Sequence, residues 1–156
     1  MMKYRIESYA TRYFIGVEKQ GGILLGNEEN IETLWEEFIA EDITLLKNLV
    51  KPIHYIGLDC YPPDFKDEKR FDYFVMAEVN SKEKQPGFVL KKLPEGRYMI
   101  FEIPNEQVQN QIRKVYQYVK ENKISVHMGF DYEDFSSANK FFDTSSTLEF
   151  ALLLNE

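Results

Sequence analysis

The hydrophobic pattern of the first third of the chain changes from a strand-like to a helix-like period. Residues 4–18 are predicted to be extended, and this segment ends at a Gly-Gly pair. Apolar residues at i, i+3, i+4 and i+7 then predict an amphipathic helix over about 31–41, which Asn27 or Asn30 can cap. The residues on its apolar face are Ile31, Leu34, Trp35 and Phe38. A second helical stretch is expected over 42–50.

The same order of elements recurs in the second half. A polar stretch at 80–87 is followed by a bent extended segment and then by a helix that Asn105 caps and that runs to about 122. The inner face of that helix carries Val108, Ile112, Val115, Tyr116 and Val119. The strands that complete the two halves are predicted at 54–61, 71–79, 88–103, 125–135 and 147–154.

Short sequence matches link the two halves. They are Arg12–Ile15 with Arg97–Ile100, Gly57–Asp59 with Gly129–Asp131, and Tyr73–Ala77 with Glu149–Leu153. Their common order indicates an internal duplication, with β-α-β-β repeats at about 1–80 and 86–156. One unit of ~75 residues exposes a face of its sheet and is marginal alone. We therefore expect a single α+β domain over 1–156, with a mainly antiparallel sheet, helices on one face and a ligand groove on the other.

Composition and charge restrict the classes of function. Aromatic residues make up 15% of the chain, with 12 Phe and 10 Tyr, which is enough to line a site for a flat ligand as well as a core. The formal charge of −7 repels phosphate backbones, so we expect no direct nucleic-acid contact. No apolar run approaches the ~20 residues that cross a bilayer, and no signal-peptide core is evident. A cytoplasmic protein without membrane contact is expected.

Signatures of metal, cofactor or acyl-transfer chemistry are not found in the sequence. His54 and His127 have no cysteine or carboxylate at ligand spacing, so no metal site is predicted. No phosphate-binding loop or dinucleotide fingerprint is present, so no cofactor is expected. Cys60 is the single cysteine and has no evident activating partner.

Several motifs resemble those of one known family. They are Tyr55–Leu58, Phe71–Tyr73, Leu93-Pro94-x-Gly96-x-Tyr98, Tyr132–Phe135 and the closing strand Leu148–Leu154. Together they resemble the GyrI-like, or AraC-type, effector-binding domain, and the chain is similar to the stand-alone members. The closing strand departs from the family at Leu153, where proline is usual, and at Ala151, where an aromatic residue is usual.

The resemblance implies a domain that binds aromatic, often cationic, drug-like compounds. Such a multidrug-binding domain acts as a sensor or sequestering protein in transcription regulation or toxin resistance. Two alternatives stay open. Some stand-alone members hydrolyse cyclopropane-type electrophiles, and namesake relatives protect a partner protein such as DNA gyrase. We expect binding rather than catalysis, and a separate regulatory protein is a candidate partner.

Glu133 is the central candidate of the site. In a strand, positions i and i+2 share a face, so Glu133 and Phe135 point the same way. A carboxylate among aromatic walls is poorly solvated and gains from a cation that carries its own apolar body. The alternative is a surface glutamate in an acidic stretch beside Asp131 and Asp134.

Aromatic residues supply the predicted walls of the site. Tyr73 and Tyr98 match tyrosines of the family, and Tyr13 is the repeat partner of Tyr98. Trp35 is the only tryptophan, and its helical spacing favours a core anchor over a pocket edge. In the hydrolase alternative, Glu133 acts as general base on water and Tyr98 polarises the leaving group.

Overall fold

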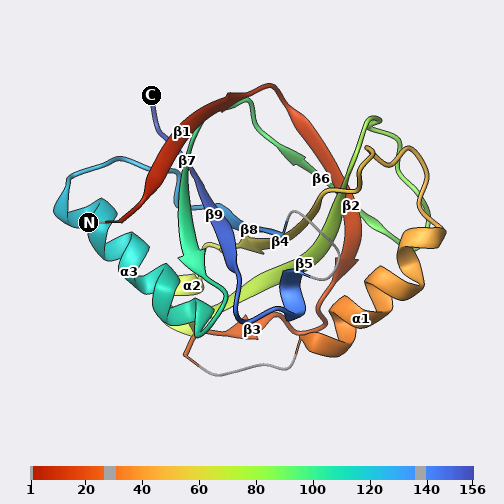
Figure 1. Cartoon of the computed structure of the whole chain (residues 1–156), viewed down its shortest axis with the longest axis horizontal. Coiled ribbons are helices and arrows are strands. Elements are labelled where there is room, and N and C mark those ends of the chain that lie inside the picture. Colours follow the sequence, from red (N-terminus) through yellow and green to blue (C-terminus); the bar gives the residue numbers. More distant parts are fainter. Residues whose placement is uncertain (1, 27–30, 136–139) are drawn as a thin grey trace.

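In the computed structural model, which describes residues 2–26, 31–135 and 140–156, a strongly curved sheet carries its helices on one side (Figure 1). The strands are β1 (Tyr4–Tyr9), β2 (Arg12–Glu18), β3 (Ile23–Leu24), β4 (Tyr55–Cys60), β5 (Arg70–Val79), β6 (Val89–Leu93), β7 (Gly96–Pro104), β8 (Phe130–Phe135) and β9 (Thr147–Leu153). The helices are α1 (Glu32–Ala40), α2 (Phe65–Glu68) and α3 (Val108–Glu121), with 3₁₀ turns η1 (Asp42–Thr44) and η2 (Lys140–Phe142).

The strand order shows the duplication. Within the described residues one sheet runs β1-β7-β9-β8-β4-β5-β2-β6, and β3 adds to β5 outside this path. Every strand pair is antiparallel, and the two halves meet where β4 pairs with β8. Reading outward from that centre, β4-β5-β2 mirrors β8-β9-β7. Each half also lends its first strand to the other, because β1 pairs with β7 and β6 with β2. The predicted α+β class and its duplicated β-α-β-β units are confirmed.

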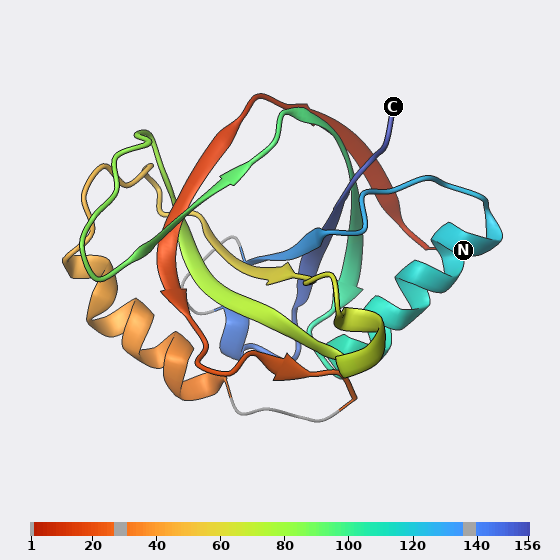
Figure 2. The same cartoon turned by 180° about the vertical axis from the view of Figure 1, so that it is seen from behind.

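Two apolar cores lie on opposite faces of the sheet because side chains alternate along each strand. The helix-side core joins Trp35 and Phe38 of α1 and Val115 and Val119 of α3 to the inward residues of the sheet. The opposite core is formed by large residues such as Ile56, Leu58, Tyr98 and Tyr132, without a helical residue among its buried members. Truncating a fully buried side chain such as Trp35 to alanine costs about 3–5 kcal/mol. The helices α1 and α3 are therefore fixed as two separate walls on one face (Figures 1 and 2).

Helix ends differ from the sequence-based expectation. The side chain of Asn105 does not cap α3, which begins after Gln107 in a left-handed conformation. Instead, its amide donates hydrogen bonds to the backbone carbonyls of Lys140, Phe141 and Asp143. The helix expected over 42–50 is reduced to η1. Asn27 and Asn30, the candidate caps of α1, lie outside the described residues. No described helix has the length and apolar character needed to cross a membrane.

Candidate functional site

Three carboxylates meet at the centre of the sheet, where the two halves join. Asp59 on β4 stands directly opposite Asp131 on β8, and Glu133 stands opposite Gly57. The exposed fractions of Asp59, Asp131 and Glu133 are 4%, 0% and 6%. One oxygen from each carboxylate lies within 4.8 Å of the other two. We call these three residues the acid cluster.

The duplication explains why two of these acids face each other. Asp59 and Asp131 occupy the same position in the matched tripeptides Gly57–Asp59 and Gly129–Asp131. When a strand is duplicated and its copies pair in antiparallel fashion, equivalent residues near the axis become cross-strand neighbours. The same shift along the chain matches Tyr61 with Glu133. The site therefore carries an acid in one half where the other half carries a tyrosine.

Two tyrosine hydroxyls cover the acid cluster. Tyr61, which follows β4, donates to Oδ2 of Asp131 at 2.7 Å, and Tyr116 of α3 donates to the same oxygen. Oδ1 of Asp131 and Oε2 of Glu133 are buried without a hydrogen-bond partner among the described residues. No ion pair links the cluster to a basic side chain in that part of the chain. The cluster is thus rich in acceptors and has no counter-charge.

The absence of a counter-charge changes the acidity of the cluster. Burial raises the pKa of Glu133 to about 8, where a hydrogen bond with the carboxyl of Asp59 opposes the rise and the charge of Asp131 adds to it. Burial, and then the charge of Glu133, raises the pKa of Asp59 well above its ordinary value. Burial and the neighbouring Asp59 do the same to the pKa of Asp131. At neutral pH the cluster therefore holds protons, which a cation could replace.

A cavity of about 470 Å³ ends at the two covering tyrosines. Its lining is mainly apolar and aromatic and consists of Leu25, Tyr61, Pro62, Phe65, Lys66, Gln109, Ile112, Arg113, Tyr116 and Met128. One wall comes from α2 and the segment before it and the other from α3, which lie side by side in both views (Figures 1 and 2). Because drug-sized ligands occupy cavities of roughly 300–1,000 Å³, this space suits a small organic molecule.

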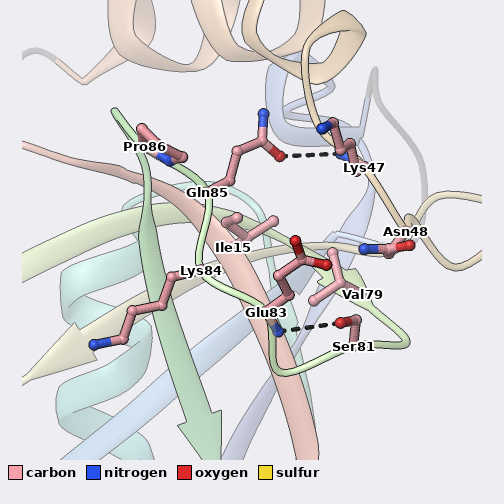
Figure 3. Close-up of a pocket in the computed structure, with 9 residues that line it drawn as sticks. All are labelled: Ile15, Lys47, Asn48, Val79, Ser81, Glu83, Lys84, Gln85 and Pro86. Carbon is pink, nitrogen blue, oxygen red and sulfur yellow. Dashed lines mark hydrogen bonds between the residues drawn. The ribbon is translucent and has the colours of Figure 1, made fainter.

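The cavity opens on the helix side of the sheet, not on the opposite face where we expected the groove. Side-chain size explains the difference. On the opposite face, Ile56, Leu58 and Tyr132 fill the space beside the strand centre. On the helix side the corresponding positions hold Gly57 and short aspartates, and α1 and α3 stand apart. Elsewhere, the described residues form a cleft of about 70 Å³ between β2 and the 81–86 loop, which is too small for a drug-sized molecule (Figure 3).

Four of the residues predicted from the sequence gather on the helix side. Tyr73 lies across from Asp59 on β5, and its ring covers Gly57 so closely that a Cβ there would sit 2.5 Å from the Tyr73 hydroxyl. The indole of Trp35 donates to that hydroxyl at 2.9 Å. Phe135 packs edge-on against Trp35, with ring centroids 5.0 Å apart. With Glu133, these residues form one buried neighbourhood, although Trp35 itself is a core residue.

The other two predicted tyrosines lie elsewhere. Tyr98 belongs to the opposite core, where its hydroxyl donates to the carbonyl of Pro94 at 2.7 Å. The sheet therefore separates Tyr98 from Glu133. Tyr13 lies on β2, with β5 and β4 between it and β8. A ligand-binding role for either tyrosine stays a prediction, and neither is placed to act on a molecule that touches Glu133.

Sequence reasoning missed part of the site. Asp59 and Tyr116 were not candidates, and Asp131 was considered only as a neighbour of Glu133 on an acidic surface. A signal for the two aspartates was present in the matched tripeptides. The three carboxylates also have the spacing of oxygen ligands for a hard divalent cation, which the sequence did not predict. A metal ion is thus a competitor that binding tests must include.

Comparison with known proteins places this chain in a family. The chain matches the family model Cass2, described as integron-associated effector binding protein, over residues 5–149. Among curated protein sequences, none matches the chain. Solved structures share the fold: SAV2435 bound to tetraphenylphosphonium has a TM-score of 0.75 and 15% identity, covering 99% of this chain and 94% of that chain. An integron cassette protein from the mobile metagenome of Vibrio cholerae has a TM-score of 0.66 and 20% identity, covering 97% and 95%.

A third structure connects the fold to a larger protein. The C-terminal domain of EcmrR has a TM-score of 0.69 and 10% identity, covering 100% of this chain and 98% of that chain. The resemblance to GyrI-like effector-binding domains noted from the motifs is thereby confirmed. Because the family model spans nearly all of the sequence, the chain belongs to the family of integron-associated effector-binding proteins.

Proposed function

We propose that the chain binds aromatic, cationic small molecules in the cavity between α2 and α3, with the positive charge directed at the acid cluster. The observation that supports this proposal is a set of three buried carboxylates without a counter-charge, next to a cavity with mainly apolar and aromatic walls. An uncompensated buried acid is costly. A ligand that brings both a positive charge and an apolar body relieves this cost.

The physical basis is an exchange of protons for a cation. In the empty site, the raised pKa values of Asp59, Asp131 and Glu133 favour the protonated carboxyls. A lipophilic cation is weakly hydrated, so it loses little hydration free energy on entering the cavity. It gains the attraction of the carboxylates from which it displaces protons. The rings of Tyr61, Phe65 and Tyr116 line its path, and each aromatic face adds about 0.5–2 kcal/mol of cation–π attraction. Tyr61 and Tyr116 must turn their hydroxyls aside to expose Asp131.

In the cell, such binding serves sensing or sequestration of a drug-like compound, in transcription regulation or toxin resistance. The support comes from the effector-binding family and from SAV2435, whose structure contains the lipophilic cation tetraphenylphosphonium. A net charge of −7 speaks against direct contact with nucleic acid, so a separate protein partner would carry a signal to DNA. We place this activity in the cytoplasm.

Calorimetric titration with tetraphenylphosphonium tests the proposal, and tetraphenylborate serves as a matched anion of nearly the same shape. We expect the cation to bind and the anion to fail. Glu133→Gln should weaken cation binding by about tenfold or more, because one charged partner is lost. Glu95→Gln, at an exposed site, should leave binding unchanged. Equal affinity for cation and anion, or no effect of Glu133→Gln in a folded variant, would refute the proposal.

Metal binding is tested in the same experiment. Calcium and magnesium chloride are titrated into the protein, and the tetraphenylphosphonium titration is repeated with each metal present. Competition by a metal at comparable affinity would mean that the acid cluster is a metal site. In that outcome the organic cation is not the primary ligand.

A second candidate function is hydrolysis of a strained cyclopropane electrophile. One observation favours it, because the partner-free Oε2 of Glu133 belongs to a carboxyl whose pKa of about 8 suits a general base. Glu133 would take a proton from water while the water oxygen bonds to a ring carbon. The ring C–C bond then breaks, the carbon it leaves takes a proton from a hydroxyl such as that of Tyr116, and the proton held by Glu133 restores that hydroxyl. Detection of a Glu133-dependent hydrolysis product would establish this activity, and its absence with intact binding would exclude it.

A further inference from the structure

The cavity has a charge arrangement that the acid cluster alone does not explain. Its lining includes two basic residues, Lys66 of α2 and Arg113 of α3, and no acidic residue. In a chain with 26 acidic and 19 basic residues, a basic lining is not expected from composition. Neither Lys66 nor Arg113 makes an ion pair within the part of the chain that the structure describes. Both side chains are therefore available to a ligand.

The two signs of charge are ordered along the cavity. Lys66 and Arg113 are exposed, whereas Tyr61 and Tyr116 are half-buried and Asp131 behind them is fully buried. Arg113 precedes Tyr116 by three residues, which places it one turn away on the same face of α3. A molecule that fills the cavity therefore has the tyrosine-covered acid cluster at its inner end and a guanidinium at its outer end.

Arg113 is also placed between two hollows. It lines a neighbouring cavity of about 480 Å³, which shares Gln109 and Arg113 with the first and includes Ile23 and Val108. Gln109 is held by a hydrogen bond from the backbone N–H of Gly26 at 3.2 Å, while the side chain of Arg113 makes no hydrogen bond within the described residues. A guanidinium at such a junction can turn toward an anionic group in either space, and its planar donors match a carboxylate or phosphate in bidentate geometry.

We infer that the preferred ligands are amphoteric: aromatic molecules with a cationic group for the acid cluster and a carboxylate or phosphate group for Arg113, with Lys66 as a second contact. This inference rests on the proposed function and narrows its ligand class. A purely cationic molecule meets attraction at the inner end and like-charge repulsion at the outer end. An amphoteric molecule satisfies both ends and brings no net charge to the cavity.

Rhodamine B and its ethyl ester provide a matched pair of probes. They share the cationic xanthene ring, but the free acid carries a carboxylate that the ester lacks. By fluorescence anisotropy we expect the wild-type protein to bind rhodamine B about three- to tenfold more tightly than the ester, as one partly exposed charged hydrogen bond allows. Arg113→Gln should abolish that preference by weakening only the free acid. Lys114→Gln, an exposed neighbour outside the cavity lining, changes the net charge equally and should preserve it.

The outcomes separate this inference from the proposed function. If both dyes bind in a Glu133-dependent manner but Arg113→Gln weakens them equally or not at all, the amphoteric preference is wrong and cation binding stands. If the ester binds more tightly than the free acid, the inference is likewise overturned. If neither dye shows Glu133-dependent binding, and tetraphenylphosphonium also fails, the proposed function falls and the inference falls with it.

Discussion

The substitution Glu133→Gln keeps the shape of the protonated carboxyl but removes its ability to ionise, which makes it a probe of the acid cluster in the absence of any ligand. Burial raises the pKa of Glu133 from 4.5 to about 8. In the unfolded chain the same carboxyl has its ordinary pKa. The folded state therefore binds this proton more tightly than the unfolded state does, and stability must depend on pH.

The direction in which stability changes with pH follows from this difference in pKa between the folded and unfolded states. Below about pH 4.5, both states are protonated and the full stability is present. As pH rises toward about 8, the unfolded chain releases the proton while the folded protein retains it, so the free energy of unfolding falls. A shift of this size corresponds to about 4–5 kcal/mol, an upper bound because water that enters the site reduces it. The raised pKa values of Asp59 and Asp131 act in the same direction.

Urea unfolding at about pH 5 and about pH 8.5 measures the effect. Wild-type protein should lose several kcal/mol between these conditions, and Glu133→Gln should lose markedly less. Burial lowers the pKa of His54, but its hydrogen bonds with Asp134 and Glu78 raise it to about 9; this contribution is common to both proteins and cancels in the comparison. Glu95→Gln is the exposed control and should follow the wild type. Parallel pH curves for wild type and Glu133→Gln would refute the claim that Glu133 is buried without a counter-charge.

Three further predictions concern the ligand and the scaffold. The affinity for tetraphenylphosphonium should rise from about pH 5 to about pH 8, by up to about tenfold per pH unit for each proton released. Calorimetry in two buffers of different ionisation enthalpy should detect the released protons, and pH-independent binding would contradict the exchange of protons for a cation. Gly57→Ala should lower the free energy of unfolding in urea by about 1–3 kcal/mol, since its Cβ would lie 2.5 Å from the Tyr73 hydroxyl. In the control Gly129→Ala the new Cβ meets only an exposed histidine ring, and equal losses for the two variants would be inconsistent with this packing. Asn105→Ala should cost about 1–3 kcal/mol, because its amide donates to three backbone carbonyls, and an unchanged urea midpoint would show that these bonds add nothing.

The parts of the fold that depend on local periodicity were predictable from the sequence. The spacing of Trp35 and Phe38 identified α1 and its buried face, and the matched tripeptides indicated two repeats. The cap of α3 was not predictable in this way. Asn105 has the chemistry of a helix cap, yet its amide bonds to a loop more than thirty residues away along the chain. A long-range contact of this kind leaves no local signal.

The site was only half predictable for a related reason. The position of Glu133 on a strand with Phe135 was correct because alternation along one strand is local. Which face Tyr98 presents depends on how β7 pairs with its neighbours, and the sequence does not specify that register. The pairing of Asp59 with Asp131 is also a matter of register. It could have been inferred only by assuming that the repeated strands pair with each other at the centre of the sheet.

Duplication also explains why a nearly symmetric scaffold holds a one-sided site. Like charges opposite each other in an antiparallel pair destabilise a sheet, and apolar residues of similar size would stabilise this one. Placing Asp59 opposite Asp131 therefore lowers the stability of the sheet, and a role in ligand binding would account for keeping the pair. Symmetry is broken at the neighbouring position, where Glu133 adds a third acid and Tyr61 a hydroxyl donor. On the side of α1, Trp35 stacks on Phe141 at 4.6 Å and fills the space. On the side of α3, Tyr116 and Tyr61 leave a cavity, so the acids that the duplication brought together can be approached from one direction.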